Sequence, residues 1–478
     1  MAYRYGERHQ MNLFPQSVED YVSADDPVRA YDGIVEALDF KELGIEWDEG
    51  QVGNPEYDPK AMIKLLTYGY SYGIRSSRKL ERAVYHNISF IWLMGSLKPD
   101  HKTIARFRKN NKGALKNILK QCARMCIKLG LIEGNTLFVD GSKIRAAASI
   151  NNTWSEEKCA RYLNKIEERI VSILRESETI DDKEQEQESL VKLKKELGDK
   201  EALKTKIQEI LKELKSEDKK SINSTDHECV KVKGRQGTHS GYNGQIVVDE
   251  KHGLIVNSDV VNESTDRKQF TNQINQANQM FDKPCSNACA DAGYASTSDL
   301  KQIDERKITV IVPSQNQANG KEPGKFDKEH FAYDKQKDCY ICPEGQEIPY
   351  SHFSTKKQHV AYRSYRFKDA SICFACRFYG ACTDSKRGRT VTRLPDEETK
   401  LKLEKQYKTD QCQAIYKLRK QKVELPFGHI KRNLGVNAFL LRGLEGVRAE
   451  MSLLSTCFNI SRMITLLGVR SLLAELSY

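Results

Sequence analysis

Residues 137–146 read LFVDGSKIRA, and this short stretch decides how the rest of the chain is interpreted. Three apolar residues run directly into a carboxylate, Asp140, and a glycine follows it. Asp before Gly is a common turn signal, so the strand context alone favours a turn at Asp140. The alternative is a ligand held at the end of a rigid strand. That alternative requires partner residues from elsewhere in the chain.

A second stretch, NACADAGYAS at 287–296, has the same character. Asp291 also follows an apolar run and precedes small residues that leave the carboxylate uncrowded. Two such carboxylates on adjacent strands would lie across the strand spacing of about 5 Å. Hard divalent cations prefer oxygen ligands, and two of them can clamp the attacking and leaving oxygens of a phosphoryl transfer. The pair therefore predicts a divalent-cation site, which a third carboxylate usually completes.

The candidate third carboxylate is Glu424, in the segment YKLRKQKVELPFGHIK at 416–431. With 3.6 residues per helical turn, the residues expected on one broad face are Tyr416, Arg419, Lys420 and Glu424, with Lys431 returning to it. A carboxylate flanked by cations suits a metal ion beside a phosphate backbone. Pro426 should kink or restart the helix just after Glu424. Without the two aspartates, solvated surface charges would be the preferred interpretation.

These three segments, in this order, resemble the catalytic segments of bacterial insertion-sequence transposases of the DDE type. The resemblance is to the IS1182 group within the broader IS4/IS5-like assemblage, and it covers most of the chain. Residues 57–111 resemble the N-terminal helical domain of that family, and GYNGQIVVD at 241–249 resembles its second strand. Tyr416, Arg419 and Lys431 match the pattern around the third acid, although one residue more than the usual three separates Arg419 from Glu424.

The resemblance implies an α/β fold with an RNase H-like catalytic core, a mixed sheet flanked by helices. It implies that Asp140, Asp291 and Glu424 hold Mg²⁺ or Mn²⁺, which reverses the initial preference for a turn at Asp140. Tyr416, Arg419 and Lys431 are then expected to hold DNA phosphates. The strand order expected from the sequence agrees: a strand with Asp140, a hairpin, a helix, a strand with Asp291, a helix and a strand.

The implied function is DNA transposition. The protein would bind terminal inverted repeats, cleave the element ends and join the 3′-hydroxyl to target DNA by two-metal phosphoryl transfer, as a homodimer on double-stranded DNA. One alternative is a catalytically silent DNA-binding protein with the same fold, which the presence of all three acids argues against. The other is an RNase H-like nuclease without strand transfer, and only an assay separates that one.

The sequence divides into four regions. Residues 1–130 are expected to form a helical, DNA-binding domain with Arg75, Arg78, Lys79 and Arg82 on its surface, although a bundle with solvated charges fits equally well. Residues 131–316 form the first part of the core, with a charged helical hairpin inserted at 155–222. Residues 317–400 form a cysteine-rich, zinc-ribbon-like insertion. Residues 401–478 supply the C-terminal helices that carry the third acid.

The insertion contains two C-x-x-C pairs and a fifth cysteine, a strong signal for structural Zn²⁺ in a reducing compartment. The five candidates are Cys339, Cys342, Cys373, Cys376 and Cys382. Spacing favours the two pairs, whereas the family resemblance favours Cys342, Cys373, Cys376 and Cys382. The alternative is a set of unligated thiols in a poorly ordered insertion. Cys122, Cys126, Cys285 and Cys289 are expected to pack in the interior, as is Trp154, and His239, His352 and His429 to be structural.

Length and composition limit the number of structural units, the kinds of partner and the location of the protein. The 478 residues exceed one ordinary core, so two to four structural units are expected. The formal net charge of +11 is compatible with a polyanionic partner without requiring one. The polar start at 1–10 and the lack of an apolar run of about 18 residues predict neither secretion nor a membrane span. The expected location is cytoplasmic and associated with the nucleoid.

Overall fold

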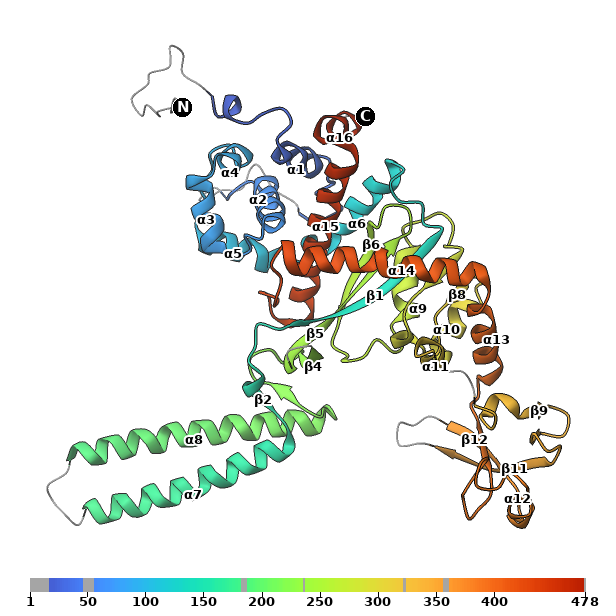
Figure 1. Ribbon diagram of the computed structural model, residues 1–478. Coiled ribbons are helices and arrows are strands. Elements are labelled where there is room, and N and C mark those ends of the chain that lie inside the picture. The colour runs from blue at the N-terminus through green and yellow to red at the C-terminus, as the bar shows by residue number, and fades with distance from the viewer. Residues whose placement is uncertain are drawn as a thin grey trace, which may run out of the picture.

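A six-stranded mixed sheet forms the centre of the molecule (Figure 1). The computed structural model describes residues 17–45, 56–181, 187–234, 237–320, 324–355 and 361–476. The strands of this sheet are β1 (Thr136–Arg145), β4 (Val230–Gly234), β5 (Gly237–Asp249), β6 (Ile255–Val261), β7 (Asn287–Cys289) and β8 (Thr309–Ile311). Their order is β4-β5-β1-β7-β8, with β6 also paired to β5. β5 runs antiparallel to β1, β4 and β6, whereas β1, β7 and β8 are parallel.

The strand predicted around Asp140 is longer than the sequence suggested. Asp140 pairs with Ile246 and Gly141 with Gln245, and β1 continues to Arg145. The turn interpretation of Asp140 is therefore wrong, and so is its placement at the tip of a strand. A dipeptide that favours turns is accommodated here because the long partner strand β5 satisfies the backbone on both sides of it.

Helices cover both faces of this sheet. On one face lie α14 (Asp410–Gly428), followed by a π-helical turn (His429–Asn433), and α15 (Gly443–Leu467). On the other lies α9 (Phe270–Asn278), followed along the chain by a 3₁₀ turn (Ala292–Tyr294) and α10 (Thr297–Asp304). α13 (Glu397–Tyr407) leads into α14, and α16 (Val469–Leu476) closes the chain. The helices and strands predicted for this part of the sequence are confirmed.

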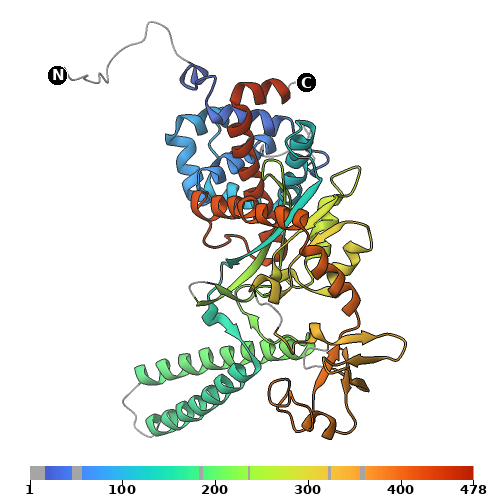
Figure 2. The ribbon, with the colours of Figure 1, turned by 45° about the vertical axis from the view of Figure 1, so that its right-hand side comes forward.

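The N-terminal region is a compact set of short helices at the end of the molecule where α16 also lies (Figure 2). Its elements are a 3₁₀ helix (Val18–Tyr21), α1 (Pro27–Glu36), α2 (Pro59–Ser71), α3 (Ser77–His86), α4 (Ile88–Leu93), α5 (His101–Asn110) and α6 (Lys112–Lys128). The caps read from the sequence are present. Asp58 accepts the N–H groups of the first turn of α2, and Asp100 accepts that of Thr103 in α5.

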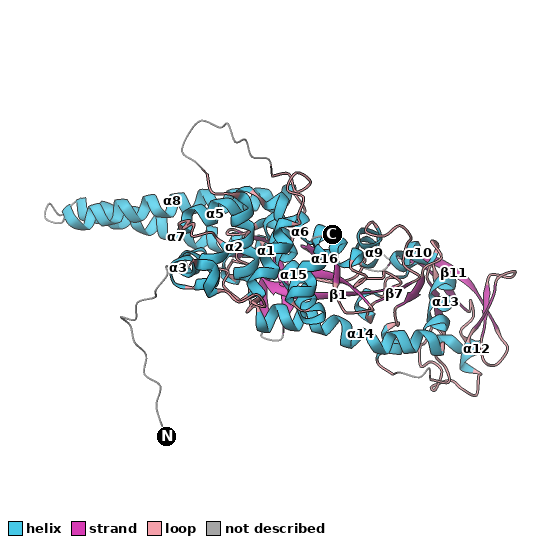
Figure 3. Ribbon diagram, turned by 90° about the horizontal axis from the view of Figure 1, so that it is seen from above, coloured by secondary structure: helices cyan, strands magenta, loops and turns pink. Residues whose placement is uncertain are grey.

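The charged insertion is a long helical hairpin that projects from the core (Figure 3). It consists of α7 (Glu156–Asp181) and α8 (Gln187–Ser216). The polar tract expected at its tip, residues 176–189, lies partly outside the described residues, at 182–186. A 3₁₀ turn (Ile150–Asn152) and the pair β2 (Thr153–Trp154) and β3 (Ile222–Asn223) close its base. Ile166 and Ile207 belong to the apolar seam between the helices, as the periodicity predicted.

The cysteine-rich insertion forms a second, small sheet on the opposite side from the helical hairpin (Figures 1 and 3). Its strands are β9 (Ala332–Asp334), β10 (Cys339–Ile341), β11 (Glu347–Thr355), β12 (Ala361–Arg366) and β13 (Thr390–Arg393), antiparallel in the order β13-β12-β11-β10-β9. Short helices flank them: α11 (Gln315–Ala318), a 3₁₀ turn (Lys328–His330) and α12 (Ser371–Phe374).

A membrane-spanning helix must be both long and apolar. No single one of the described helices is long and apolar enough to cross a bilayer. The pair α15 and α16, bent by 107°, passes by length and composition only.

Candidate functional site

Asp140 lies on β1, and Asp291 lies two residues past the end of the neighbouring strand β7. β1 and β7 are parallel, with Phe138 paired to Cys289. Continuing that register by two residues brings Asp140 level with Asp291. Asp291 begins the 3₁₀ turn after β7, and its Oδ1 accepts the backbone N–H of Gly293 at 2.7 Å. One carboxylate is thus fixed by a strand and the other by a capped turn.

Asp140 is an electrostatically strained carboxyl group. Its side chain is only 19% exposed, and burial is the main cause that raises its pKa to about 7. The charges of Asp291 and Asp266 push the pKa in the same direction, and the Arg419 guanidinium opposes them. Arg419 Nη1 lies 3.5 Å from Asp140 Oδ1. The carboxylates of Asp140 and Asp291 repel each other, and the long ion pair with Arg419 offsets only part of this repulsion. Their oxygen atoms are the kind of ligand that a hard divalent cation prefers.

Two of the predicted phosphate-binding residues lie on this same face of β1. Arg419 contacts Asp140, and Lys431 Nζ lies 2.6 Å from Ser142 Oγ, two residues further along the strand. Tyr416 packs edge-on against Tyr407, with ring centroids 5.1 Å apart. α14 and the π turn after it therefore hold two cations over the strand that carries Asp140.

Glu424 lies on α14, the helix whose Arg419 contacts Asp140. It is exposed on α14, and five residues along an α-helix place it about 140° around the axis from Arg419. This angle is the width of the broad face expected from the sequence, and Lys431, seven residues after Glu424, reaches Ser142 on the strand that carries Asp140. The helix also does not break at Pro426 but continues to Gly428, and the irregularity comes later as the π turn. Within the described residues, no group of three or more His, Cys, Asp and Glu side chains is arranged to hold a metal ion.

One nearby carboxylate was not singled out by the sequence patterns. Asp266, in the loop between β6 and α9, accepts hydrogen bonds from Lys143, Asn243 and Gln245. It raises the pKa of Asp140 and therefore lies within electrostatic range of it. No motif marks this residue. The signal that the sequence offers is an acidic residue shortly after β6, a strand that pairs with β5, the partner of the Asp140 strand.

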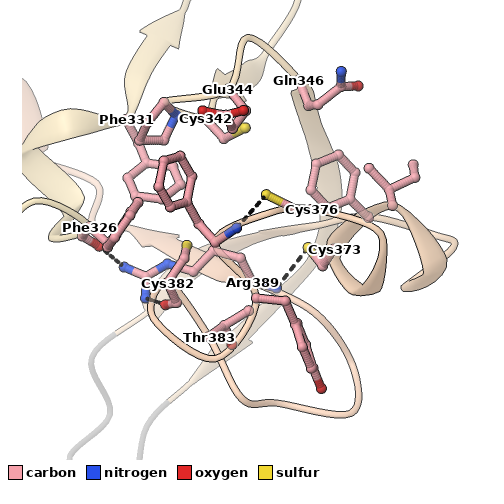
Figure 4. A pocket seen from close by; sticks show the side chains of 15 residues that line it. Phe326, Phe331, Cys342, Glu344, Gln346, Cys373, Cys376, Cys382, Thr383 and Arg389 are labelled. Atoms are coloured by element: carbon pink, nitrogen blue, oxygen red, sulfur yellow. Dashed lines mark hydrogen bonds between the residues drawn. The ribbon is translucent and has the colours of Figure 1, made fainter.

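Four of the five candidate cysteines line one pocket in the insertion (Figure 4). They are Cys342, Cys373, Cys376 and Cys382, the set favoured by the family resemblance. Cys339 lies buried on β10 and is not part of the lining. Two backbone N–H groups point at the sulfurs: Phe378 N lies 3.5 Å from Cys376 Sγ, and Arg389 N lies 3.4 Å from Cys373 Sγ. Such donors stabilise thiolate ligands.

The other cysteines, two of the histidines and the tryptophan considered in the sequence contact neighbouring side chains or lie in the interior. Cys122, Cys126, Cys285 and Cys289 are buried, as predicted. His429 packs edge-on against Phe458, and His239 lies 3.2 Å from an Arg145 guanidinium nitrogen. Trp154 packs against Tyr162 under the ammonium group of Lys158.

The basic surface predicted for the N-terminal helices is only partly present. Arg78, Lys79 and Arg82 are exposed on α3. Arg75 is not, because its guanidinium pairs with the fully buried carboxylate of Glu450 at 3.0 Å and with the carbonyl of Ala438. Glu450 in turn accepts the N–H groups of Leu440 and Leu441. Arg75 therefore ties the N-terminal helices to the loop after the π turn.

Two protein-family models match the chain. Residues 16–110 match a family described as Transposase domain (DUF772), which spans the described helices α1 to α5. Residues 341–464 match a family described as Transposase DDE domain, which spans the cysteine pocket, α14 and most of α15. No curated protein matches the chain. The chain therefore carries two transposase domains, the pair typical of IS1182-family transposases, which confirms the resemblance seen in its sequence.

Proposed function

We propose that this transposase cuts and joins DNA at the Asp140 face of β1. The observation that carries the proposal is the placement of Asp140 on β1 and of Asp291 just past its parallel neighbour β7. Arg419 and Lys431 are held over the face of β1 that carries Asp140. The substrates are the terminal inverted repeats of the element and the target DNA. The protein acts as a homodimer, because two ends must be processed together.

An RNase H-like core is part of this proposal. Its support is the strand arrangement, in which β6, β5 and β1 are antiparallel neighbours and β7 and β8 extend the sheet in parallel from β1. The first and second acids then come from the central strand and its parallel neighbour. This is the arrangement expected from the order of elements along the sequence.

Asp140 and Asp291 would hold the divalent cations, and Glu424 would supply the third carboxylate. Bound Mg²⁺ or Mn²⁺ lowers the pKa of an attacking water or 3′-hydroxyl and stabilises charge on the leaving oxygen. Arg419 favours the ionised form of Asp140 through their ion pair and so opposes the effect of burial, which raises the pKa of Asp140. Lys431 and Tyr416 bind and orient phosphates of the DNA beside the acids.

The cysteine pocket is proposed to hold one structural Zn²⁺. Cys342, Cys373, Cys376 and Cys382 line it together, and thiolates suit a tetrahedral zinc site. Gly345 in the turn after Cys342 has a φ of 76°, which favours glycine. This turn allows the Gly345 N–H to bond back to the Cys342 carbonyl at 2.8 Å.

The test is cleavage of linear DNA that carries the sequences flanking this chain's own reading frame. The wild-type protein with Mg²⁺ should release a 3′-hydroxyl end and then join it to a second DNA. Cleavage without joining, under conditions where precleaved ends are supplied, would favour the nuclease alternative. Sequence-specific binding without any cleavage in Mg²⁺ or Mn²⁺ would favour the catalytically silent alternative.

A further inference from the structure

The two faces of β1 at the candidate site are built differently. Side chains alternate along a strand, so Asp140 and Ser142 share one face, and Gly141 and Lys143 share the other. Arg419 and Lys431 approach the first face. On the second face, Lys143 lies opposite Asn243 and Gly141 lies opposite Gln245 in the pairing with β5.

Asp266 fills the second face. Its Oδ1 accepts from Lys143 Nζ at 3.0 Å, Asn243 Nδ2 at 2.7 Å and Gln245 Nε2 at 2.9 Å, and its Oδ2 accepts from Lys143 at 3.2 Å. Asn243 and Gln245 are fully buried. A carboxylate that three donors hold against the underside of the strand has little freedom to move.

Gly141 makes this arrangement possible. A Cβ atom built on Gly141 would lie 2.4 Å from Asp266 Oδ1, 2.5 Å from Gln245 Nε2 and 3.0 Å from the hydroxyl of Tyr294. These are ends of side chains, but their mutual hydrogen bonds prevent them from swinging aside. The glycine after Asp140 is therefore required for close approach on the opposite face rather than for a turn.

Hydrogen bonds continue from this cluster to the second acid. The Tyr294 hydroxyl donates to Gln245 Oε1, whose amide nitrogen donates to Asp266. Burial raises the pKa of Tyr294 well above its ordinary value, which keeps the hydroxyl protonated as a donor. Tyr294 is the last residue of the 3₁₀ turn that Asp291 caps. The position of this turn is thereby fixed relative to β1 and β5.

We infer that Asp266, Gln245 and Tyr294 are positioning residues, which hold the Asp291 turn at the distance from Asp140 that a shared divalent cation needs. The inference rests on the proposed function of Asp140 and Asp291. Groups that orient metal ligands through hydrogen bonds typically change metal affinity by about 10–100-fold when they are removed. Asp266 itself acts through Gln245 and Tyr294 and is not a ligand.

The test measures Mn²⁺ binding to the full-length protein without DNA, from the free Mn²⁺ signal in electron paramagnetic resonance. The Mg²⁺ concentration for half-maximal DNA cleavage is a second readout. Tyr294→Phe removes one hydroxyl and should weaken Mn²⁺ binding by about tenfold. It should raise the half-maximal Mg²⁺ concentration similarly and leave the rate at saturating Mg²⁺ much closer to wild type.

Two substitutions of Asp266 separate positioning from direct ligation. Asp266→Asn keeps an acceptor oxygen for Asn243 and Gln245, so Mn²⁺ binding should stay within about threefold of wild type. Asp266→Ala removes that acceptor and should weaken Mn²⁺ binding about as much as Tyr294→Phe does. The double variant Asp266→Ala/Tyr294→Phe should bind Mn²⁺ no more weakly than the worse of the two single variants, because both substitutions interrupt the same series of hydrogen bonds. A loss in Asp266→Asn as complete as in Asp140→Asn would overturn the inference and make Asp266 a ligand.

Tyr242→Phe is the matched control. It also removes a buried hydroxyl bonded to a carboxylate, that of Asp226 at 2.7 Å, but Tyr242 pairs with Ile144 and so lies on the face of the sheet opposite to Asp266. Tyr242→Phe should bind Mn²⁺ normally. Wild-type binding by Tyr294→Phe together with a loss in Asp140→Asn would overturn the positioning role alone. Wild-type Mn²⁺ binding and cleavage by Asp140→Asn would instead overturn the proposed function.

Discussion

The sheet site and the cysteine pocket are two candidate metal centres that the chain builds in opposite ways. Asp140 sits on β1 and Asp291 just past β7, and the register of these two strands is fixed inside the large central core. The pocket cysteines sit on turns and on the short helix α12, at a small cluster of buried residues: Phe331, Tyr340, Ile348, Tyr365, Phe367, Cys373 and Val391. At the sheet site, the large core holds the candidate ligands in place. At the cysteine pocket, only a small core is available to hold them.

This difference separates the roles that a metal can have. Small units with few core residues usually need a metal or disulfides to remain folded, and binding energy then becomes folding energy. The central sheet has no such need, and its buried, mutually repelling carboxylates cost stability when no cation is present. We therefore expect metal loss to unfold the insertion but to leave the sheet intact.

The largest expected effect is on the insertion. Cys373→Ser/Cys376→Ser should lose about one equivalent of zinc, since a site with two ligands removed cannot close. Limited proteolysis should then cut within 324–396 while the central sheet persists. Cys339→Ser is the matched control, because its thiol lies outside the pocket. Full zinc content and protease resistance in the double variant would show that the pocket holds no metal.

A smaller effect, of opposite sign, is expected at the sheet site. Asp140 has a folded-state pKa of about 7, above its unfolded value of about 3.9. The resulting stabilisation is complete below pH 4 and is lost as the pH rises through 7. In the presence of a chelator, Asp140→Asn should therefore be more stable than wild type at pH 8 by about 1–3 kcal/mol, and the difference should shrink at pH 5.

Thermal or urea unfolding at the two pH values measures this effect. Asp304→Asn is the control, because Asp304 on α10 is a similarly buried carboxylate that is paired with Lys402. A wild-type protein that is as stable as Asp140→Asn at pH 8 would mean that the carboxylate is not strained. Asp140 would then lose the electrostatic feature that favours a cation.

The smallest effect tests whether DNA binding is independent of both centres. Replacing Arg78, Lys79 and Arg82 of α3 by Ala should weaken binding to the element ends by roughly tenfold at moderate salt and flatten its salt dependence. Replacing Lys192, Lys194 and Lys195 of α8 is the charge-matched control. Equal losses in the two triple variants would show that α3 is not a specific DNA-binding surface.

Much of this architecture could be predicted because its signals are local. Asp58-Pro59 and Asp100 mark helix starts through caps that the structure contains, and alternating apolar residues mark β5 and β6. The pairing of the Asp140 and Asp291 strands followed from the order of elements.

The errors arose where geometry depends on distant partners. Asp140-Gly141 has the sequence of a turn, but β5 and the cluster around Asp266 hold it as a strand. Spacing alone could not exclude Cys339, because its orientation is set by the pairing of β10 with β9 and β11.

The central claim is that Asp140, Asp291 and Glu424 act as one catalytic metal site, and one measurement tests it directly. The rate of end cleavage in Mg²⁺ is compared among wild type, Asp140→Asn, Asp291→Asn, Glu424→Gln and the triple variant, with Glu445→Gln on α15 as control. Each single change should lower the rate by at least about a thousandfold, with the triple variant little worse, because the residues act as a unit. Cleavage by Asp140→Asn at the wild-type rate would contradict the account.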